Sequence, residues 1–168
     1  MQQQNFYRPE IDGLRAIAVT MVVLYHTNFS LEKLNLFQGG YVGVDIFFVI
    51  SGYLISKIIF VKIKSNNFSF VEFYINRVKR ILPALIFVIF LSFFVAIKIY
   101  LPVNLIEYSK SIIYSLFFSS NFYFHYSGKL YGAESSLLLP FLHTWSLAIE
   151  EQFYIIFPLF FFYIIKIC

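Results

Sequence analysis

Residues Ile81–Leu101 have the sequence ILPALIFVIFLSFFVAIKIYL, in which Lys98 is the only charged side chain. A helix of about 20 such residues crosses the hydrocarbon core of a bilayer. The rest of the chain is similarly apolar, since 60% of its 168 residues are hydrophobic, 22% are aromatic and only 13% are charged. So few charges cannot cover the surface of a soluble domain of this size. The composition indicates an integral membrane protein and excludes a disordered tail and a nucleic-acid-binding domain.

Three further stretches are long enough to cross a membrane, namely Leu14–Leu31, Val42–Ile63 and Trp145–Ile167. A fourth, Val103–Phe124, contains a Glu, a Lys and several Ser and Asn residues, so it can span, re-enter or lie in the interface. We therefore expect an all-α polytopic bundle of four to five transmembrane helices. The whole chain, residues 1–168, is expected to be part of one integral-membrane domain with no separate soluble domain.

The basic residues predict the orientation of the chain. Five of them lie between Lys62 and Arg80, whereas the loop after the first stretch carries only Lys33. Because Lys and Arg concentrate in cytoplasmic loops, we expect the N-terminus and the 62–80 segment in the cytoplasm and the first loop outside. Lys166 favours a cytoplasmic end for the last helix, which would leave Val103–Phe124 non-spanning. The polar N-terminus does not resemble a cleavable signal peptide.

Arg15 and His26 are ionisable residues within the first stretch. They are eleven residues apart, about three helical turns, so a helix places them on one face with roughly 16 Å between them. Ionisable groups inside a membrane are costly and often functional, so the pair can line a polar channel. Alternatively, Arg15 extends to the headgroups and His26 is a hydrogen-bonded interface histidine.

Asp45 follows Gly39, Gly40 and Gly43 at the start of the second stretch. The glycines permit a tight turn or a close approach of two helices. The carboxylate can pair with His26 and orient it. Alternatively, it is an aspartate at a helix N-terminus, stabilised there by the helix dipole.

Arg77 and Arg80 are spaced i, i+3 and so share one face of a helix. Guanidinium groups bind phosphate bidentately, which makes a cofactor with a pyrophosphate group a plausible ligand. The alternative is that this basic cluster only fixes the topology. The single cysteine, Cys168, allows neither a disulfide framework nor a Cys-based metal site, and we expect no metal.

Glu150 and Glu151 are adjacent within the last apolar stretch, and His143 and Trp145 lie just upstream. Successive helical residues point about 100° apart, so at most one of the two acids can face a given group. We expect one of them to meet the polar face of the first stretch. A helix that only anchors the chain in lipid would not need these carboxylates.

These motifs, in this order, resemble the N-terminal part of the membrane-bound acyltransferase 3 family, which includes bacterial O-antigen and peptidoglycan O-acetylases. The resemblance covers nearly the whole chain. The most specific match is the twelve-residue stretch HTWSLAIEEQFY at His143–Tyr154. The other matching segments are Tyr7–Ala18 continuing to His26, Gly39–Leu54, and Arg77–Arg80 followed by Leu82 and Pro83.

The resemblance implies the transfer of an acyl group, usually acetyl, from cytoplasmic acyl-CoA to a hydroxyl of a cell-surface carbohydrate such as the O-antigen of lipopolysaccharide. The expected partners are membrane lipid, acyl-CoA and the glycan acceptor, in the cytoplasmic (inner) membrane. His26 would act as general base or carry the acyl group transiently. The implied catalytic residues, expected to converge on a polar tunnel, are Arg15, His26, Asp45 and Glu150. The implied acyl-CoA ligands are Arg77 and Arg80, and further substrate-contact candidates are Ser51, His143, Trp145 and Glu151.

Two other interpretations remain open from the sequence. A proton-coupled transporter would also place His, Asp and Glu in its membrane helices, but it would not need the Arg pair. An inactive truncated membrane fragment would explain the length of the chain, because members of the family carry several further membrane helices. Binding of acetyl-CoA would separate an enzyme from a transporter.

Overall fold

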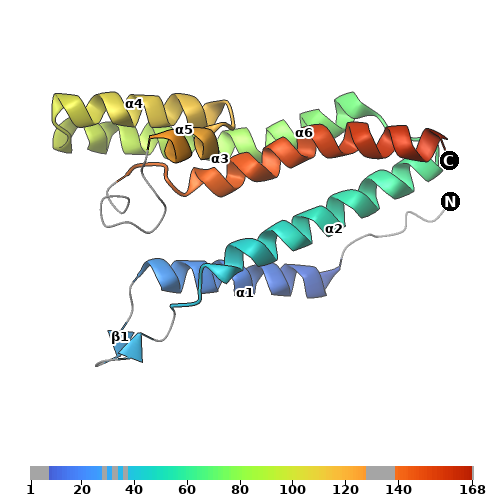
Figure 1. Cartoon of the computed structure of the whole chain (residues 1–168), viewed down its shortest axis with the longest axis horizontal. Helices are drawn as coiled ribbons and strands as arrows, with labels where there is room; N and C mark the ends of the chain where they lie inside the picture. Colours follow the sequence, from blue (N-terminus) through green and yellow to red (C-terminus); the bar gives the residue numbers. More distant parts are fainter. Residues whose placement is uncertain (1–7, 28–29, 32–33, 36–37, 128–138, 168) are drawn as a thin grey trace. The chain divides into compact units, whose positions relative to one another are not determined.

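The computed structural model describes residues 8–27, 30–31, 34–35, 38–127 and 139–167, and these are almost entirely helical, as predicted. The chain divides into two units, Met1–Ile58 and Ile59–Cys168, which are described separately. β1 and β2 have two residues each and pair antiparallel. The elements in chain order are α1 (Pro9–His26), β1 (Ser30–Leu31), β2 (Leu34–Asn35), α2 (Val42–Lys64), α3 (Phe70–Ile99), α4 (Pro102–Leu116), α5 (Ser120–Tyr126) and α6 (Thr144–Ile167) (Figure 1).

In the first unit, α1 packs closely against the start of α2. A Cβ atom on Gly43 would lie 2.5 Å from the carbonyl oxygen of Ala18, and one on Gly40 would collide with Met21 and Tyr25. Only glycine allows the two backbones this close, as at many helix contacts in membranes. Of the two uses that the sequence left open for the glycines, a tight turn or a close helix approach, Gly40 and Gly43 therefore serve the close approach.

Three helices are long and apolar enough to span a membrane among the described residues, namely α2, α3 and α6. This is fewer than the four to five expected, and α1 accounts for much of the difference. The helix ends at His26 rather than continuing to Leu31, and the hydroxyl of the following Thr27 donates to the carbonyl oxygen of Leu24. Its 18 residues also include the charges of Glu10, Asp12 and Arg15.

α3 begins eleven residues before the apolar stretch that predicted it. The Ser69 hydroxyl accepts a hydrogen bond from the backbone N–H of Glu72 at 3.4 Å, and the Glu72 carboxylate pairs with Lys62 at 3.0 Å. This capping arrangement starts the helix within the basic segment. Thirty residues of helix extend about 45 Å, which exceeds the hydrocarbon core by roughly 15 Å.

The ambiguous segment Val103–Phe124 forms two helices rather than one. α4 ends at Leu116 and α5 begins at Ser120, with Phe118 between them at a φ of 49°. A left-handed residue of this kind ends a helix and turns the chain. The break excludes a single uninterrupted membrane helix over this segment. In the second unit, α5 packs on α4 and α6, and α4 packs on α3.

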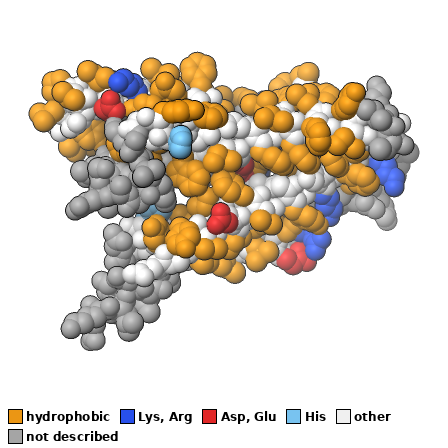
Figure 2. Space-filling view, in the orientation of Figure 1, with side chains coloured by type: hydrophobic (Ala, Val, Ile, Leu, Met, Phe, Trp, Pro, Cys, Tyr) orange, Lys and Arg blue, Asp and Glu red, His pale blue; other side chains and the backbone are white. Residues whose placement is uncertain are grey.

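Hydrophobic side chains cover most of the visible surface of the helices (Figure 2). Many large apolar residues of α3 are at least half exposed, among them Phe87, Phe90 and Phe94. Exposed apolar area on this scale is unfavourable in water and is expected where a helix faces lipid. A small buried core lies between α3 and α4, where Ala96 and Tyr108 pack with Phe141.

Candidate functional site

The second unit contains a charged cluster between α3 and α6, built around Arg77. The guanidinium carbon of Arg77 lies 4.2 Å from the ring centroid of Tyr154 and 5.8 Å from that of Phe73. Tyr154 is only 3% exposed, and its hydroxyl donates to the Glu150 carboxylate. The arginine is therefore held by an aromatic ring whose own position is fixed by a carboxylate.

Glu151 completes this cluster as a deeply buried acid, with 7% of its surface exposed. Among the described residues, its Oε1 atom has no hydrogen-bond partner. The charges of Glu150 and Glu151 both interact with Arg77. The charges of both acids of α6 therefore act on an arginine of α3, an interaction that the sequence analysis did not consider.

Arg77 and Arg80 differ in their surroundings although they share one face of α3. Arg77 is half-buried against α6, whereas Arg80 is exposed. Arg80 is therefore accessible to a ligand, while the Arg77 guanidinium is partly committed to the Tyr154 ring. The sequence spacing alone did not distinguish the two arginines, either as phosphate ligands or as residues that fix the topology.

In the first unit, Arg15 and His26 lie on the single helix α1, so they share a face as expected. Arg15 pairs with Asp12 at 3.6 Å. The Nδ1 atom of the exposed His26 lies 2.8 Å from the carbonyl oxygen of Val22. A carbonyl only accepts, so Nδ1 carries the hydrogen and the lone pair of the neutral ring is on Nε2.

Asp45 is exposed in the first turn of α2, where the helix dipole stabilises a carboxylate. Gly40 packs against Met21 and Tyr25 and Gly43 against Ala18, so α1 and α2 run antiparallel. This register brings Asp45 closer along the axis to the Arg15 end of α1 than to the His26 end. Its pairing with His26 stays a prediction. Ser51, farther along α2, is buried at 4% exposure.

The predicted convergence of Arg15, His26 and Asp45 with Glu150 would join the two units, so it stays a prediction. Within each unit, the structure places the site candidates on neighbouring helices. In the first, they lie on α1 and on the start of α2. In the second, Arg77, Glu150 and Glu151 form the cluster between α3 and α6.

The start of α6 carries the remaining candidates. His143 is exposed just before the helix, with its ring stacked 6.2 Å from that of Phe141, and Trp145 is half-buried in the first turn. Between them, the buried hydroxyl of Thr144 lies 2.8 Å from that of Ser115 in α4. These contacts fasten the start of the Trp-Glu-Glu-Gln segment to α4.

Gln152 has a structural role that the sequence analysis missed. Its side-chain nitrogen donates to the carbonyl oxygen of Phe118 at 2.8 Å and to Asn121 Oδ1 at 3.0 Å, and its oxygen accepts from the Asn121 amide at 3.2 Å. All its strong donors and its acceptor are thereby used at the turn between α4 and α5. An amide within an apolar helix was the available signal, because such a group requires partners.

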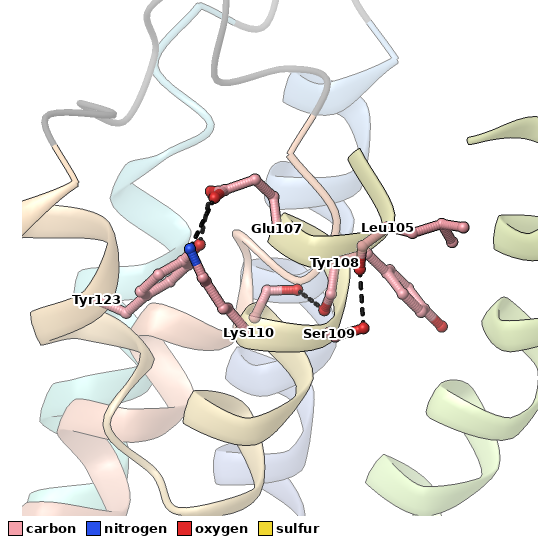
Figure 3. A network of polar contacts seen from close by, with 7 residues as sticks. Leu105, Glu107, Tyr108, Ser109, Lys110 and Tyr123 are labelled. Atoms are coloured by element: carbon pink, nitrogen blue, oxygen red, sulfur yellow. Dashed lines mark hydrogen bonds and ion pairs between the residues drawn. The ribbon is translucent and has the colours of Figure 1, made fainter. Parts of the chain in front are cut away.

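A second polar network joins α4 and α5 (Figure 3). The Glu107 carboxylate accepts from the Tyr123 hydroxyl at 2.8 Å and pairs with Lys110 at 3.2 Å. The ring of Tyr123 stacks on that of Tyr114 with 4.7 Å between centroids. Burial, followed by the hydrogen bond to Glu107, raises the pKa of Tyr123 above its usual value. The two charged residues of the Val103–Phe124 segment, Glu107 and Lys110, therefore pair with each other.

These features define a helical membrane protein with an arginine–carboxylate cluster between two of its apolar helices. Among the described residues, no three His, Cys, Asp or Glu side chains gather where they could hold a metal ion. The acyltransferase 3 family, described as an acyltransferase domain, matches residues 8–167. The chain belongs to this family, which confirms the resemblance seen in the sequence.

The similar proteins include peptidoglycan O-acetyltransferase OatA of Listeria monocytogenes, which is 41% identical over 92% of this chain. The putative peptidoglycan O-acetyltransferase YrhL of Bacillus subtilis is 42% identical over 94% of the chain, and O-acetyltransferase OatA of Staphylococcus aureus is 38% identical over 91%. The chain spans 24% of the length of each of these relatives. No solved structure matches it.

Proposed function

We propose that this protein takes part in transferring an acetyl group from acetyl-CoA, on the cytoplasmic side of the membrane, to a hydroxyl of a cell-wall carbohydrate. The observation that carries the proposal is the His26 imidazole, whose Nδ1–H is engaged by the Val22 carbonyl. The Nε2 lone pair is thereby oriented as a proton acceptor. The names of the relatives favour peptidoglycan over the O-antigen as the acceptor.

In the reaction, the acceptor oxygen forms a bond with the acetyl carbonyl carbon, and the bond from that carbon to the CoA sulfur breaks. Nε2 of His26 takes the hydroxyl proton and returns it to the leaving thiolate. In the covalent alternative, Nε2 itself carries the acetyl group between the two substrates. Arg15 lies three turns away on the same face of α1, about 16 Å from His26 along the axis, so it would hold the CoA end of the donor.

The donor would be held at the cluster in the second unit. The exposed guanidinium of Arg80 can bind an oxygen pair of the CoA diphosphate, and Arg77 adds a second positive charge on the same face. Asp45 would support Arg15, and Glu150 would hold Arg77 through Tyr154. Ser51, His143, Trp145 and Glu151 are retained as candidates for substrate contact.

The test measures CoA release by the purified chain in proteoliposomes supplied with acetyl-CoA and a peptidoglycan disaccharide. We expect His26→Ala and His26→Gln to abolish acceptor-dependent release, because neither side chain can accept the proton. His125→Gln is the matched control, since His125 is exposed at the end of α5. A burst of CoA release without acceptor would support the covalent route.

Near-normal turnover of His26→Gln would contradict the assignment and make Glu150 the leading candidate for the base. If the unmodified chain released no CoA, the proposed activity would fail for this chain. The fragment interpretation would then stand.

A further inference from the structure

A cavity of about 600 Å³ lies in the second unit, where the end of α2, the turn that follows it and the end of α6 meet. This is the end of α6 near the mark for the C-terminus in Figure 1. None of the residues singled out in the sequence lines it. Its lining includes three aromatic rings, of Phe60, Phe68 and Phe162, and two polar side chains, of Lys64 and Asn66.

The aromatic part of the lining is suited to a planar ligand. The rings of Phe68 and Phe162 lie 6.2 Å apart with 30° between their planes, and Phe70 supports Phe162 edge-on at 5.2 Å. Phe60 lies on the α2 side of the cavity. Aromatic walls bind heteroaromatic bases by stacking, which does not depend on the identity of the base.

The polar part of the lining supplies a positive charge and an amide. Lys62 is paired with Glu72 at 3.0 Å, whereas no ion pair of Lys64 is found in the part of the chain that is described. The Lys64 ammonium lies 5.9 Å from the centroid of the Phe60 ring. Asn66, at a φ of 55° in the turn, provides an amide that can both donate and accept. The amide can bind the polar edge of a base, and the ammonium can bind a phosphate group.

The cavity also lies close to the arginine pair. Arg77 and Arg80 are seven and ten residues beyond the start of α3 at Phe70, so they lie about 10 and 15 Å along its axis. On α6, Phe162 is eight residues beyond Tyr154, which contacts Arg77, so it lies about 12 Å away. In CoA, one ribose and its 5′ carbon join the adenine to the diphosphate. A nucleotide seated in the cavity with its 5′ carbon on the arginine side could therefore reach the arginines with its diphosphate.

We propose that this cavity binds the adenosine 3′-phosphate end of acyl-CoA. Adenine stacks on the aromatic rings, Asn66 contacts the edge of the base, and Lys64 pairs with the 3′-phosphate. The proposal rests on the proposed function, because that function supplies the donor. It adds a second contact region, which would make the protein select CoA over smaller thioesters.

The test measures binding of three donors to the purified chain in detergent by calorimetry, namely acetyl-CoA, 3′-dephospho-acetyl-CoA and acetyl-4′-phosphopantetheine. Ile165 lines the cavity, so Ile165→Trp fills it, and Ile164→Trp is the matched control on the neighbouring, exposed position. We expect Ile165→Trp to weaken acetyl-CoA binding about tenfold and to leave acetyl-4′-phosphopantetheine unaffected. Lys64→Gln should weaken acetyl-CoA but not its 3′-dephospho form.

Unchanged acetyl-CoA affinity in Ile165→Trp would overturn the proposal, as would an equal loss for acetyl-CoA and acetyl-4′-phosphopantetheine. If the cavity instead holds a lipid headgroup, phosphatidylglycerol should stabilise the unmodified protein but not Ile165→Trp. Ile165→Trp should then bind acetyl-CoA normally. If the unmodified chain bound none of the three donors, the proposed function would fail as well. The two failures are therefore distinguishable.

Discussion

The guanidinium of Arg77 lies over the ring of Tyr154, with 4.2 Å from the guanidinium carbon to the ring centroid. The two residues belong to α3 and α6, which are separated in the sequence by α4 and α5. The contact joins two of the three helices that, in the part of the chain that the structure describes, are long and apolar enough to span a membrane. It places the charge of one helix on the aromatic face of another, so the position of the arginine depends on α6.

We predict that Tyr154→Leu destabilises the protein by about 1–2 kcal/mol, because it removes a desolvated cation–π contact and the hydrogen bond to Glu150. Tyr154→Phe should cost less, since the ring remains. Thermal unfolding in detergent, followed by the fluorescence of the single tryptophan, Trp145, measures both. Tyr163→Leu, at an exposed position of the same helix, should leave the midpoint unchanged. Equal midpoints for Tyr154→Leu and Tyr163→Leu would contradict the prediction.

The two arginines of α3 should respond differently to replacement by lysine. Arg80→Lys keeps the charge but loses the planar fork, so we expect acetyl-CoA to bind about tenfold more weakly with no change in the unfolding midpoint. Arg77→Lys should lower both the affinity and the midpoint, because the guanidinium also packs on Tyr154. Calorimetric titration and thermal unfolding provide the two readouts. Lys79→Arg serves as a control that preserves charge.

Should both arginine variants bind acetyl-CoA as tightly as the unmodified protein, the pair would have no role in donor binding. The pair would then serve only to fix the topology and, through Arg77, to pack on Tyr154.

Gly43 should not tolerate a side chain. We expect Gly43→Ala to destabilise the α1–α2 contact by about 1–3 kcal/mol, because the new methyl group would lie 2.5 Å from the Ala18 carbonyl oxygen. Gly52→Ala, on the same helix, meets nothing within 4 Å and should be neutral or slightly stabilising. The loss of helical circular dichroism on heating compares the two variants. Equal stabilities would show that the helices can separate at no cost.

The turn between α2 and α3 should face the cytoplasm. In a Cys168→Ser background, Asn67→Cys should resist a membrane-impermeant maleimide in intact cells and react after lysis, because the neighbouring basic residues stay inside. Gln38→Cys, exposed before α2, is the control expected to react in intact cells. Labelling of Asn67→Cys before lysis would place the arginine pair on the wrong side for a cytoplasmic donor.

The apolar pattern predicted α2 and α6 nearly to the residue, because a long apolar stretch has few alternatives in a membrane. The apolar pattern misplaced the start of α3, because hydropathy does not detect the polar part of a helix that extends beyond the membrane. The capping pair of Ser69 and Glu72 was the signal for this start. The apolar pattern also extended the predicted first helix to Leu31, because apolar residues follow His26. In the structure, α1 ends at His26.

The sequence singled out the ionisable candidates for the site, but it did not give the side chains that contact them. Helical periodicity gives the face on which a residue lies, and it does not say which helix covers that face. The sequence analysis therefore expected one of the two acids, Glu150 or Glu151, to meet the first stretch, and it did not find the interaction of both acids with Arg77 of α3. The contacts of Tyr154 and Gln152 were not predicted, because the search for functional residues in the apolar stretches relied on charged side chains. A tyrosine and an amide are uncharged.

The length of α3 has a consequence for how a highly charged substrate is handled at a membrane. The helix exceeds the hydrocarbon thickness by roughly 15 Å, and both arginines lie within this surplus. In the proposed reaction, the phosphates of the donor would stay in the hydrated headgroup layer, where the basic side chains bind them. Only the uncharged pantetheine arm would enter the oily interior, which avoids a dehydration penalty of tens of kcal/mol for the anionic groups.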